Sequence, residues 1–316
     1  MSRALVTGGA GFIGSHLVDA LLAHGHEVRV LDDLSTGYIA NLDEAGISAG
    51  DRLEIVQGSI RDESSLDAAM DRVQAVFHLA GLVAVPESIE NPLKCIDLND
   101  LGVYGIYAAA AEHGARRVVF SSSSAIYGDL PVPHHEELCP QPDTPYAIHK
   151  LLGEHYGKFF SGYRGLETVY LRYFNVYGPR QLPDSPYSGV ISIFMEKLHQ
   201  GLPVTIFDDG GQTRDFVYVA DVVRANLAAA FAPAERASGR AFNIGSGKAV
   251  SILNLYEHLA GLAGSRTRPV FAPPRPGDIR HSQGPISLAA ECLSFRPETE
   301  LAEGLGRTWN WFTKSV

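Results

Sequence analysis

The chain alternates short apolar runs with segments whose apolar residues recur every three or four positions. Residues 3–9 form an apolar run that ends in glycines. Residues 12–25 follow with a helical period, and residues 27–33 form the next apolar run. This strand–helix–strand pattern predicts two parallel strands that are joined by a right-handed crossover.

The same alternation continues to residue 178. Further strands are predicted at 53–59, 75–81, 116–124 and 166–178, and helices at 64–73, 95–113 and 146–160. Repeated strand–helix units with apolar strands are typical of a parallel sheet that is covered on both faces. The fold class is therefore predicted as α/β, a doubly wound Rossmann-type sheet.

The pattern becomes less regular after Gly178, where several prolines mark a long loop. Shorter elements follow: helices near 191–199, from 221 and from 252, and strands near 204–207, 215–219 and 241–246. We interpret residues 1–178 as a cofactor-binding domain and 179–316 mainly as a smaller substrate-binding lobe. Some segments of the second part are expected to return to the first domain.

The composition restricts the classes of function. The 316 residues are 45% hydrophobic and 20% charged, with a net charge of −10, as in a soluble globular enzyme that has no general affinity for nucleic acid or anionic membranes. No apolar run is long enough to span a membrane, and the N-terminal residues lack a signal-peptide layout. The three scattered cysteines suggest no disulfide framework, so a cytoplasmic location is predicted.

A glycine-rich turn, "TGGAGFIG", carries the first candidate chemistry. Gly8, Gly11 and Gly14 lie between a predicted strand and a helix, where they allow backbone N–H groups to approach a pyrophosphate. Asp32 ends the next strand at the distance expected for a carboxylate that binds the adenosine ribose. Asp33 adds negative charge and no arginine lies near, so NAD is predicted rather than NADP.

A second constellation lies in the middle of the chain. The segment "FSSSSAIYG" ends a strand, so its serines are expected at the ligand-binding edge of the sheet. Tyr146 and Lys150 are four residues apart and share one face of the following helix. A neighbouring ammonium and an oxidised nicotinamide would favour the phenolate and lower the tyrosine pKa. Such a tyrosine can take a proton from a sugar hydroxyl while hydride leaves the same carbon.

Together these segments resemble the extended short-chain dehydrogenases/reductases over essentially the whole chain, and most closely the UDP-hexose 4-epimerases. The resemblance rests on "TGGAGFIGSH", "HLAGLVAVPES", "FSSSSAIYG", "TPYAIHK", "LRYFNVYGPRQ", "QTRDFVYVADVV", "AFNIGSG" and "RPGDIRHS". It implies that Tyr146 is the catalytic base, Lys150 its modulator and Ser123 the catalytic serine.

The resemblance also implies a set of cofactor contacts. They are Gly8, Gly11, Phe12, Ile13, Gly14, Asp32, Asp33, Ser35, Thr36, Gly37, Ser59, Ile60, Leu79, Ala80, Gly81, Asn99, Ser121, Tyr146, Lys150, Tyr173 and Val176. Asn99 matches the asparagine that usually steadies the active site. Ser59 stands where the family usually has an aspartate, so one adenine contact is in question.

Two further departures concern the surroundings of the site. His149 replaces a frequent serine beside the catalytic pair and is expected on the helix surface. Val83 replaces a lysine found in some relatives. The pairs at 24/26 and 134/135 are the nearest histidine groupings, and neither has a third ligand nearby, so no metal is predicted.

The residues after Ser123 indicate the reaction. Related dehydratases and decarboxylases usually carry acidic residues there, whereas this chain has Ser124 and Ala125. A reaction that needs only hydride and one proton is favoured, namely NAD-dependent 4-epimerisation through a transient 4-keto sugar. A dehydratase or decarboxylase is a weaker alternative. A non-catalytic NAD-binding regulator is disfavoured because the Ser, Tyr and Lys are all present.

Matching to the family also implies the substrate contacts. These are Val83, Ser123, Ser124, Tyr146, Asn175, Gly189, Val190, Arg214, Arg275, Asp278 and Ser282. A small residue at 282 leaves room for an N-acetyl group, which favours UDP-GlcNAc/UDP-GalNAc together with UDP-Glc/UDP-Gal. A UDP-glucuronate 4-epimerase is the alternative. The helices at 95–113 and 146–160 resemble the pair that forms the homodimer interface of the family.

Overall fold

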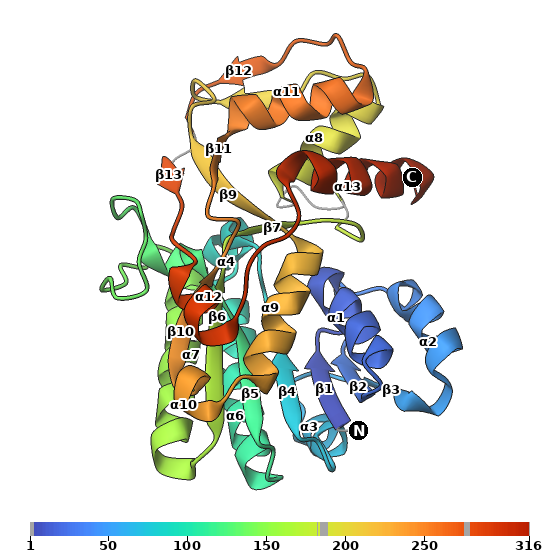
Figure 1. The fold of residues 1–316 in the computed structure, drawn as a ribbon, viewed down its shortest axis with the longest axis vertical. Helices are drawn as coiled ribbons and strands as arrows, with labels where there is room; N and C mark the ends of the chain where they lie inside the picture. The colour runs from blue at the N-terminus through green and yellow to red at the C-terminus, as the bar shows by residue number, and fades with distance from the viewer. Residues whose placement is uncertain (1–2, 182, 184–188, 275–278, 316) are drawn as a thin grey trace.

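The computed structural model describes residues 3–181, 183, 189–274 and 279–315. A parallel sheet with helices on both sides forms the larger part, and a smaller lobe of helices and short strands lies over one end of it (Figure 1). That end is where the carboxyl ends of the first strands meet the glycine-rich turn. The arrangement places the predicted cofactor segments between the two parts.

The central sheet has seven strands in the order β10-β6-β5-β4-β1-β2-β3, and every neighbouring pair is parallel. Its strands are β1 Arg3–Thr7, β2 Glu27–Asp32, β3 Leu53–Gln57, β4 Ala75–His78, β5 Arg117–Ser123, β6 Glu167–Tyr173 and β10 Arg240–Ile244. The predicted doubly wound fold is confirmed. The chain order reverses at β1, between β2 and β4, and ligands bind at such switch points.

Helices cover both faces of this sheet because its strands are apolar on both sides. Side chains of α1 Phe12–Ala23, α2 Asp43–Ala49, α9 Val219–Phe231 and α12 Ser287–Leu293 share one buried core with the strands. Side chains of α3 Glu63–Met70, α6 Gly102–Glu112 and α7 Pro145–Arg164 share the core on the other face. Short helical segments lie between these elements: Ile39–Leu42, Gly50–Arg52, α4 Val85–Glu90, Ser124–Tyr127 and α10 Ala234–Ala237.

The helix predicted at 95–113 begins earlier and contains an irregular turn. It consists of α5 Pro92–Ile96, a π-helical turn at Asp97–Leu101 and then α6. A π turn adds one residue to a helix and is frequent at functional sites. Here it directs Asn99 into the protein, where its side chain is buried.

The strand predicted at 166–178 is two strands. β6 belongs to the large sheet, whereas β7 Asn175–Tyr177 pairs with β9 Thr213–Tyr218 of the small lobe. Phe174 lies between them, and its N–H donates to the carbonyl of Ile244 at 3.0 Å. A single apolar run thus carries the chain from one sheet into the other, a division that periodicity alone does not reveal.

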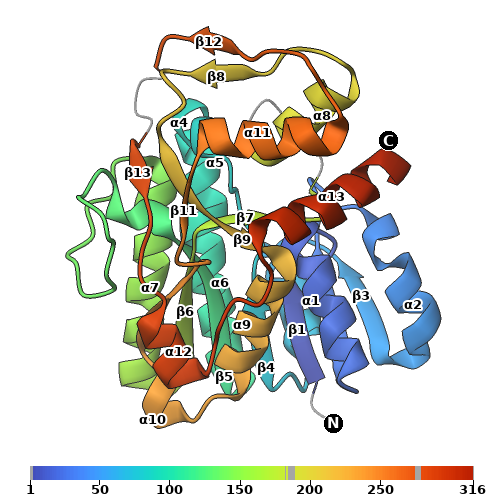
Figure 2. The same ribbon diagram turned by 45° about the horizontal axis from the view of Figure 1, so that its top comes forward.

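The small lobe has its own apolar core, formed by α8, α11, α13 and β9. Its elements are α8 Val190–His199, β8 Thr205–Phe207, β11 Ala249–Ser251, α11 Ile252–Ala263, β12 Val270–Ala272, β13 His281–Ser282 and α13 Leu301–Ser315. β12 and β8 form a two-stranded sheet at the far edge of the lobe (Figure 2).

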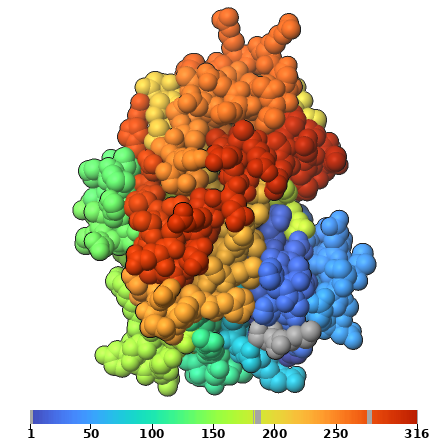
Figure 3. All heavy atoms as spheres, in the orientation of Figure 1, coloured from blue at the N-terminus to red at the C-terminus, as the bar shows by residue number. Residues whose placement is uncertain are grey.

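The second part of the chain contributes to both bodies. β10 is the edge strand of the large sheet, and α9 and α12 pack on its face. The C-terminal segments reach from the upper lobe down over the lower part beside α9 (Figure 3). The division into 1–178 and 179–316 stays a prediction. Among the described residues, no helix is both long and apolar enough to cross a bilayer.

Candidate active site and cofactor cradle

A cavity of about 620 Å³ opens where the sheet meets the small lobe. Most residues predicted for the site line it: Gly8, Gly11, Phe12, Ile13, Gly14, Asp32, Asp33, Ser35, Thr36, Gly37, Ile60, Leu79, Ala80, Gly81, Val83, Ser121, Ser123, Tyr146, Lys150, Tyr173, Asn175, Val176 and Gly189. They come from loops that are far apart in the sequence but adjacent at the carboxyl ends of the strands.

Other predicted residues do not line this cavity. Ser59, Asn99, Ser124, Val190, Arg214 and Ser282 are not among its lining residues. Arg275 and Asp278 lie outside the described residues. Gly58 and Ile60 reach the cavity on either side of Ser59, whose Oγ accepts the N–H of Arg61 at 3.1 Å.

The glycine-rich turn is packed too closely for side chains. Gly8 has a φ of +69°, and a Cβ there would lie 2.9 Å from the N of Ala80. A Cβ at Gly14 would lie 2.1 Å from the carbonyl oxygen of Gly8. The first turn of α1 is thereby pressed against the end of β1, and the N-terminus of α1 faces the cavity. Such a terminus favours an anionic ligand such as a pyrophosphate.

Asp32 forms the other end of this cradle. One carboxylate oxygen accepts the N–H of Ala10 at 2.9 Å and the other accepts the N–H of Leu34 at 2.9 Å. Burial raises the pKa of Asp32; these two hydrogen bonds oppose that rise, and the neighbouring Asp33 charge adds to it. The carboxylate is therefore fixed in orientation and lines the cavity as an acceptor for hydroxyl groups. Residues 8–14 and Asp32 are called the cofactor cradle below.

The three predicted catalytic side chains converge in the same cavity. Ser123 ends β5, and Tyr146 is the second residue of α7, with Thr144 capping the helix through its hydroxyl. Lys150 lies one turn further along α7. Its Nζ donates to the carbonyl of Ser121 at 2.6 Å and lies 5.7 Å from the centre of the Tyr146 ring.

The electrostatics of the pair differ from the sequence-based expectation. Burial raises the pKa of Tyr146, and its hydrogen bond with Ser123 only partly opposes this. Burial lowers the pKa of Lys150 to about 8. The reason is that both groups lie in an apolar pocket, where the charged form of each is disfavoured. The expected lowering of the tyrosine pKa therefore requires a further positive charge in the cavity.

Asn99 lies behind the cavity and holds its wall. Its Oδ1 accepts the N–H of Leu82 and its Nδ2 donates to the carbonyl of Leu82, both at 2.8 Å. A Cβ at Gly81 would lie 2.7 Å from the Asn99 Oδ1. The π turn thus positions an amide that pins the loop after β4, while the loop itself lines the cavity.

His149 is buried, so its predicted surface position was wrong. Its Nδ1 lies 2.5 Å from the Asp100 Oδ1. Burial raises the Asp100 pKa, and His149 opposes this through its charge and hydrogen bond. The physical reason is that α7 packs against the π turn, which covers the face of α7 that an isolated helix would expose.

Arg214 and Ser282 are neighbours although 68 residues separate them. β13 pairs in parallel with β9, and Ser282 is the partner of Arg214 in that pairing. Side chains of paired residues point to the same face of a sheet, and Ser282 is buried. The adjacent Asp215 accepts the N–H groups of Ser246 and Gly247 at 2.7 and 2.9 Å, which anchors the loop after β10.

The cavity is also lined by residues that were not predicted individually as site residues. These are Leu31, Tyr38, Asn41, Gly58, Leu82, Ala84, Glu87, Lys94, Leu98, Ser122, Phe174, Arg180 and Gln181. Glu87 forms an ion pair with Lys94 at 2.7 Å. Arg180 has a φ of +67°, unusual for a non-glycine residue, and donates to Asp19 at 2.8 Å. Seven of them lie in the quoted segments "HLAGLVAVPES", "FSSSSAIYG" and "LRYFNVYGPRQ". The positions of the others depend on loop paths that the pattern does not contain.

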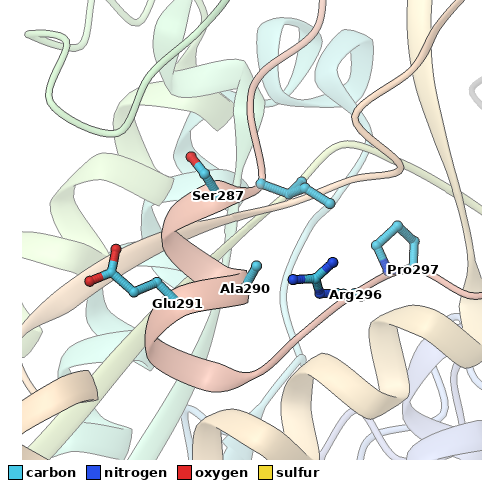
Figure 4. Close-up of a pocket in the computed structure, with 6 residues that line it drawn as sticks. Ser287, Ala290, Glu291, Arg296 and Pro297 are labelled. Atoms are coloured by element: carbon cyan, nitrogen blue, oxygen red, sulfur yellow. The ribbon is translucent and has the colours of Figure 1, made fainter.

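A second hollow, of about 600 Å³, lies on α12 and the segment after it. Arg296 and Pro297 lie across from the helix, and Glu291 points away from them (Figure 4). None of the residues predicted for the site lines this hollow. The chemistry therefore belongs to the cavity at the carboxyl ends of the strands.

A doubly wound sheet with a glycine cradle, a buried carboxylate at the end of the second strand and a Ser–Tyr–Lys group is typical of a nucleotide-dependent enzyme of the oxidoreductase type. The sequence model of the NAD dependent epimerase/dehydratase family matches residues 4–245. The chain belongs to this family, which confirms the resemblance and makes NAD its cofactor. The cradle fits that cofactor, since it offers N–H groups for a pyrophosphate and a carboxylate for a ribose.

Individual relatives cover almost the whole chain. The UDP-glucose 4-epimerase of Mycolicibacterium smegmatis is 40% identical over 98% of both chains. The crystal structure of the UDP-glucose 4-epimerase of Thermotoga maritima, with UDP-glucose, has a TM-score of 0.92 at 38% identity and covers 99% of both chains. The UDP-N-acetylglucosamine 4-epimerase of Methanobrevibacter ruminantium M1, in complex with UDP-N-acetylmuramic acid, has a TM-score of 0.93 at 36% identity, covering 100% of this chain and 99% of that one.

Proposed function

We propose that this chain is a UDP-hexose 4-epimerase that acts on UDP-GlcNAc/UDP-GalNAc and also on UDP-Glc/UDP-Gal. The observation that carries the proposal is the convergence of Ser123, Tyr146 and Lys150 in the cavity that contains the cofactor cradle. This group supplies one proton acceptor beside a redox cofactor. The similarity to epimerases of both plain and N-acetylated hexoses supports the same class of substrate.

In the proposed reaction Tyr146 takes the proton of the sugar 4-hydroxyl. The Ser123 hydroxyl lies beside it and orients the C4 oxygen, so that the O–H bond points at the phenolate. Bound NAD supplies the acceptor, and later the donor, of the C4 hydride. After the 4-keto sugar has turned, Tyr146 returns the proton to the oxygen while hydride enters the opposite face of C4.

Lys150 contributes charge and position. Its Nζ is held by the Ser121 carbonyl beneath the tyrosine, and its lowered pKa of about 8 still leaves it largely protonated near neutral pH. The ammonium thus favours the phenolate form of Tyr146. Because burial alone raises the tyrosine pKa, full activation is expected only with the oxidised cofactor in place.

The carboxylates of the cavity argue against elimination chemistry. Among the described residues that line it, the carboxylates are Asp32, Asp33 and Glu87. The first two belong to the cofactor end. Glu87 is paired with Lys94, and the positions directly after Ser123 are Ser124 and Ala125. A dehydratase needs an additional acid and base at the sugar, and this arrangement supplies neither next to Ser123.

The nucleotide is proposed to lie along the small lobe. Asn175 and Gly189 line the cavity, and Gly189 precedes Val190, the first residue of α8. A helix N-terminus and the guanidinium of Arg214 on β9 suit a diphosphate. Arg275 and Asp278 remain proposed partners for the nucleotide on the basis of the sequence alone.

Ser282 is proposed to leave room for the 2-acetamido group of the sugar. It sits beside Arg214 in the β9–β13 pairing, next to the proposed nucleotide anchor. A side chain of two heavy atoms occupies little of the space on that face. A tyrosine in its place would extend by several ångströms toward the sugar.

The test is to incubate the purified protein, with no NAD added, with UDP-GlcNAc, UDP-glucose and UDP-glucuronate, and to resolve the epimers by NMR. We expect 4-epimers of the first two. Turnover of UDP-glucuronate alone would replace the proposed substrate by the acidic sugar. Tightly bound NAD without turnover of any UDP-hexose would contradict the proposed reaction.

We further propose that the protein forms a homodimer through α5, α6 and α7. The sequence matches residues 95–113 and 146–160 to the dimer interface of the family. Large apolar side chains are exposed on α5, the π turn, α6 and α7: Leu93, Ile96, Leu101, Tyr104, Ile148, Phe159 and Tyr163. Leu93 and Tyr163 are 78% and 80% exposed. Exposed apolar clusters of this kind mark interaction sites.

Sedimentation analysis tests this interface. Tyr104→Arg with Phe159→Arg is expected to convert a dimer to a monomer. Phe271→Arg, a change at an equally exposed aromatic residue on β12, is the matched control and should leave the dimer intact. A monomeric wild type would contradict the proposal.

A further inference from the structure

A buried ion pair lies directly behind the catalytic strand. Arg172 on β6 donates to both carboxylate oxygens of Glu154 on α7, at 2.9 and 2.8 Å. Both side chains are buried, and Glu154 also accepts the hydroxyl of Ser122 at 2.6 Å. Ser122 precedes the catalytic Ser123, and Glu154 lies one helical turn after Lys150. The pair is thus tied to both catalytic elements.

Tyr127 extends this hydrogen-bond network from Arg172 to Asn243. Its hydroxyl accepts from the Arg172 Nη1 at 2.9 Å and donates to the Asn243 Oδ1 at 2.8 Å. The side chains of Tyr127 and Asn243 are fully buried. Asn243 lies on β10, so the tyrosine links the 3₁₀ turn after β5 to the last strand of the sheet.

Asn243 in turn holds the segment that follows Ser282. Its Nδ2 donates to the carbonyls of His134 and Pro285, at 2.8 and 3.3 Å. The N–H of His134 donates to the carbonyl of Gln283 at 2.8 Å. A Cβ at Gly284 would lie 2.5 Å from the His134 carbonyl oxygen, so the two segments touch. Residues 282–285 are called the substrate wall below.

These contacts form one continuous path from the catalytic serine strand to the substrate wall. We infer that Tyr127 and Asn243 are positioning residues that fix the distance between Ser123 and the substrate wall, and so set how well the nucleotide sugar is held. The inference rests on the proposed function for its substrate. Neither residue lines the cavity, so both act through others.

The energetics favour a fixed rather than an adaptable wall. Buried polar groups are costly when one partner is lost, and chains of hydrogen bonds strengthen one another. The wall itself is loop and a two-residue strand, with few apolar anchors of its own. Its position is therefore set by the polar network, by the pairing of Ser282 with β9, and by Gln283, whose Nε2 donates to the carbonyl of Gly247 at 2.9 Å.

The test compares Tyr127→Phe with Tyr170→Phe in the NAD-bound protein. Tyr170 on β6 is as fully buried as Tyr127, and its hydroxyl pairs with Thr168, away from the wall. In Tyr127→Phe we expect KM for the UDP-sugar to rise about tenfold, kcat to change less than about threefold, and the bound NAD to be unchanged. Tyr170→Phe should leave KM unchanged.

A second variant covers the case in which Tyr127→Phe does not fold. Gln283→Ala removes the other tether at a partly exposed position and should raise KM in the same direction but by less. Wild-type KM in either folded variant would overturn the inference. So would equal changes in Tyr127→Phe and Tyr170→Phe, since these would indicate a general loss of packing.

Hydrogen exchange separates this inference from the proposed function. The His134 amide, which donates to the wall, should exchange at least about tenfold faster in Tyr127→Phe than in Tyr170→Phe, whether or not a UDP-hexose is turned over. If the wild type fails on every UDP-hexose but this difference is present, the proposed substrate is wrong and the positioning role stands. Equal exchange in both variants would overturn the positioning role.

Discussion

The cofactor cradle and the substrate wall are built in different ways. The cradle uses residues close in sequence, from the glycine turn to Asp32, on parallel strands that are buried on both faces. The wall, residues 282–285, is held by β9, β10 and the loop at 134, through one short strand pairing and a few single hydrogen bonds. The first is a property of one local unit, whereas the second depends on the whole fold.

This difference separates chemistry from specificity. A compact unit with no room for side chains at Gly8 and Gly14 suits a cofactor that is the same in every cycle. A wall that is assembled from distant segments can change without disturbing that unit. Substitutions in the cradle should therefore abolish all reactions together, and substitutions in the wall should alter the choice of sugar.

The sharpest test of the chemical half is Tyr146→Phe. The change removes the proposed proton acceptor but keeps the ring, so kcat is expected to fall about 10²- to 10⁴-fold for every substrate. NAD content and UDP affinity should remain, as measured by absorbance of the released cofactor and by calorimetry. A mutant with wild-type turnover would show that another group takes the proton.

Gly14→Ala should break the cradle. The added Cβ would lie 2.1 Å from the Gly8 carbonyl, so the turn must open and bound NAD should fall at least about tenfold. Gly46→Ala in α2, where a Cβ meets no atom within 4 Å, is the matched control. It should keep its NAD and gain up to about 1 kcal/mol of stability. Retention of full cofactor content in Gly14→Ala would refute the close packing.

Ser282→Tyr should alter the wall alone. We expect kcat/KM for UDP-GlcNAc to fall about 10- to 200-fold while UDP-galactose is retained, because only the acetylated sugar needs the space. Ser282→Ala serves as the control and should keep both substrates. Equal losses on both sugars, or no loss on either, would mean that position 282 does not distinguish them.

The smallest expected effect is on the stability of the fold at acidic pH, and it comes from His78 at the end of β4. Burial lowers the pKa of His78 to about 3, and the Lys150 charge acts in the same direction. His78 is protonated near pH 6.5 in the unfolded chain but stays neutral in the folded chain. The stability that the neutral His78 permits is therefore fully present above pH 6.5 and is lost as the pH falls toward 3. Over this range the free energy of unfolding falls by about 1.4 kcal/mol per pH unit.

His78→Asn should remove this part of the pH dependence. The asparagine cannot titrate and can keep the hydrogen bond to the Thr7 hydroxyl, now 2.7 Å from the His78 Nδ1. Urea unfolding at pH 7, 6 and 5 should give a shallower decline than in the wild type, with the exposed His24→Asn as control. Parallel declines in His78→Asn and wild type would show that His78 takes up its proton in the folded state.

The sequence predicts the cradle well because its signals are local. The spacing of Gly8, Gly11 and Gly14, followed by Asp32 at a strand end, needs only one strand–helix–strand unit to be interpreted. The same holds for Tyr146 and Lys150, whose separation of one helical turn places them together. The roles assigned to these residues stay predictions.

The rest depends on packing that the pattern does not contain. His149 has a surface-like position on an isolated helix, but the π turn covers it. The run at 166–178 shows no break in its pattern, yet it divides at Phe174. Its first part pairs with β5 of the large sheet and its last part pairs with β9 of the small lobe. Tyr127 lies in the "FSSSSAIYG" motif, but its contacts could not be predicted, since its partners Arg172 and Asn243 come from strands 45 and 116 residues away.

The pairing of Ser282 with Arg214 has a consequence for how such enzymes diverge. Successive residues of a strand point to opposite faces, so inserting or deleting one residue just before His281 would turn Ser282 away from Arg214 and bring a neighbour in its place. Loop length would then change the proposed sugar pocket as effectively as a substitution. Relatives that differ in length near this point therefore need not share a substrate, even when every catalytic residue is identical.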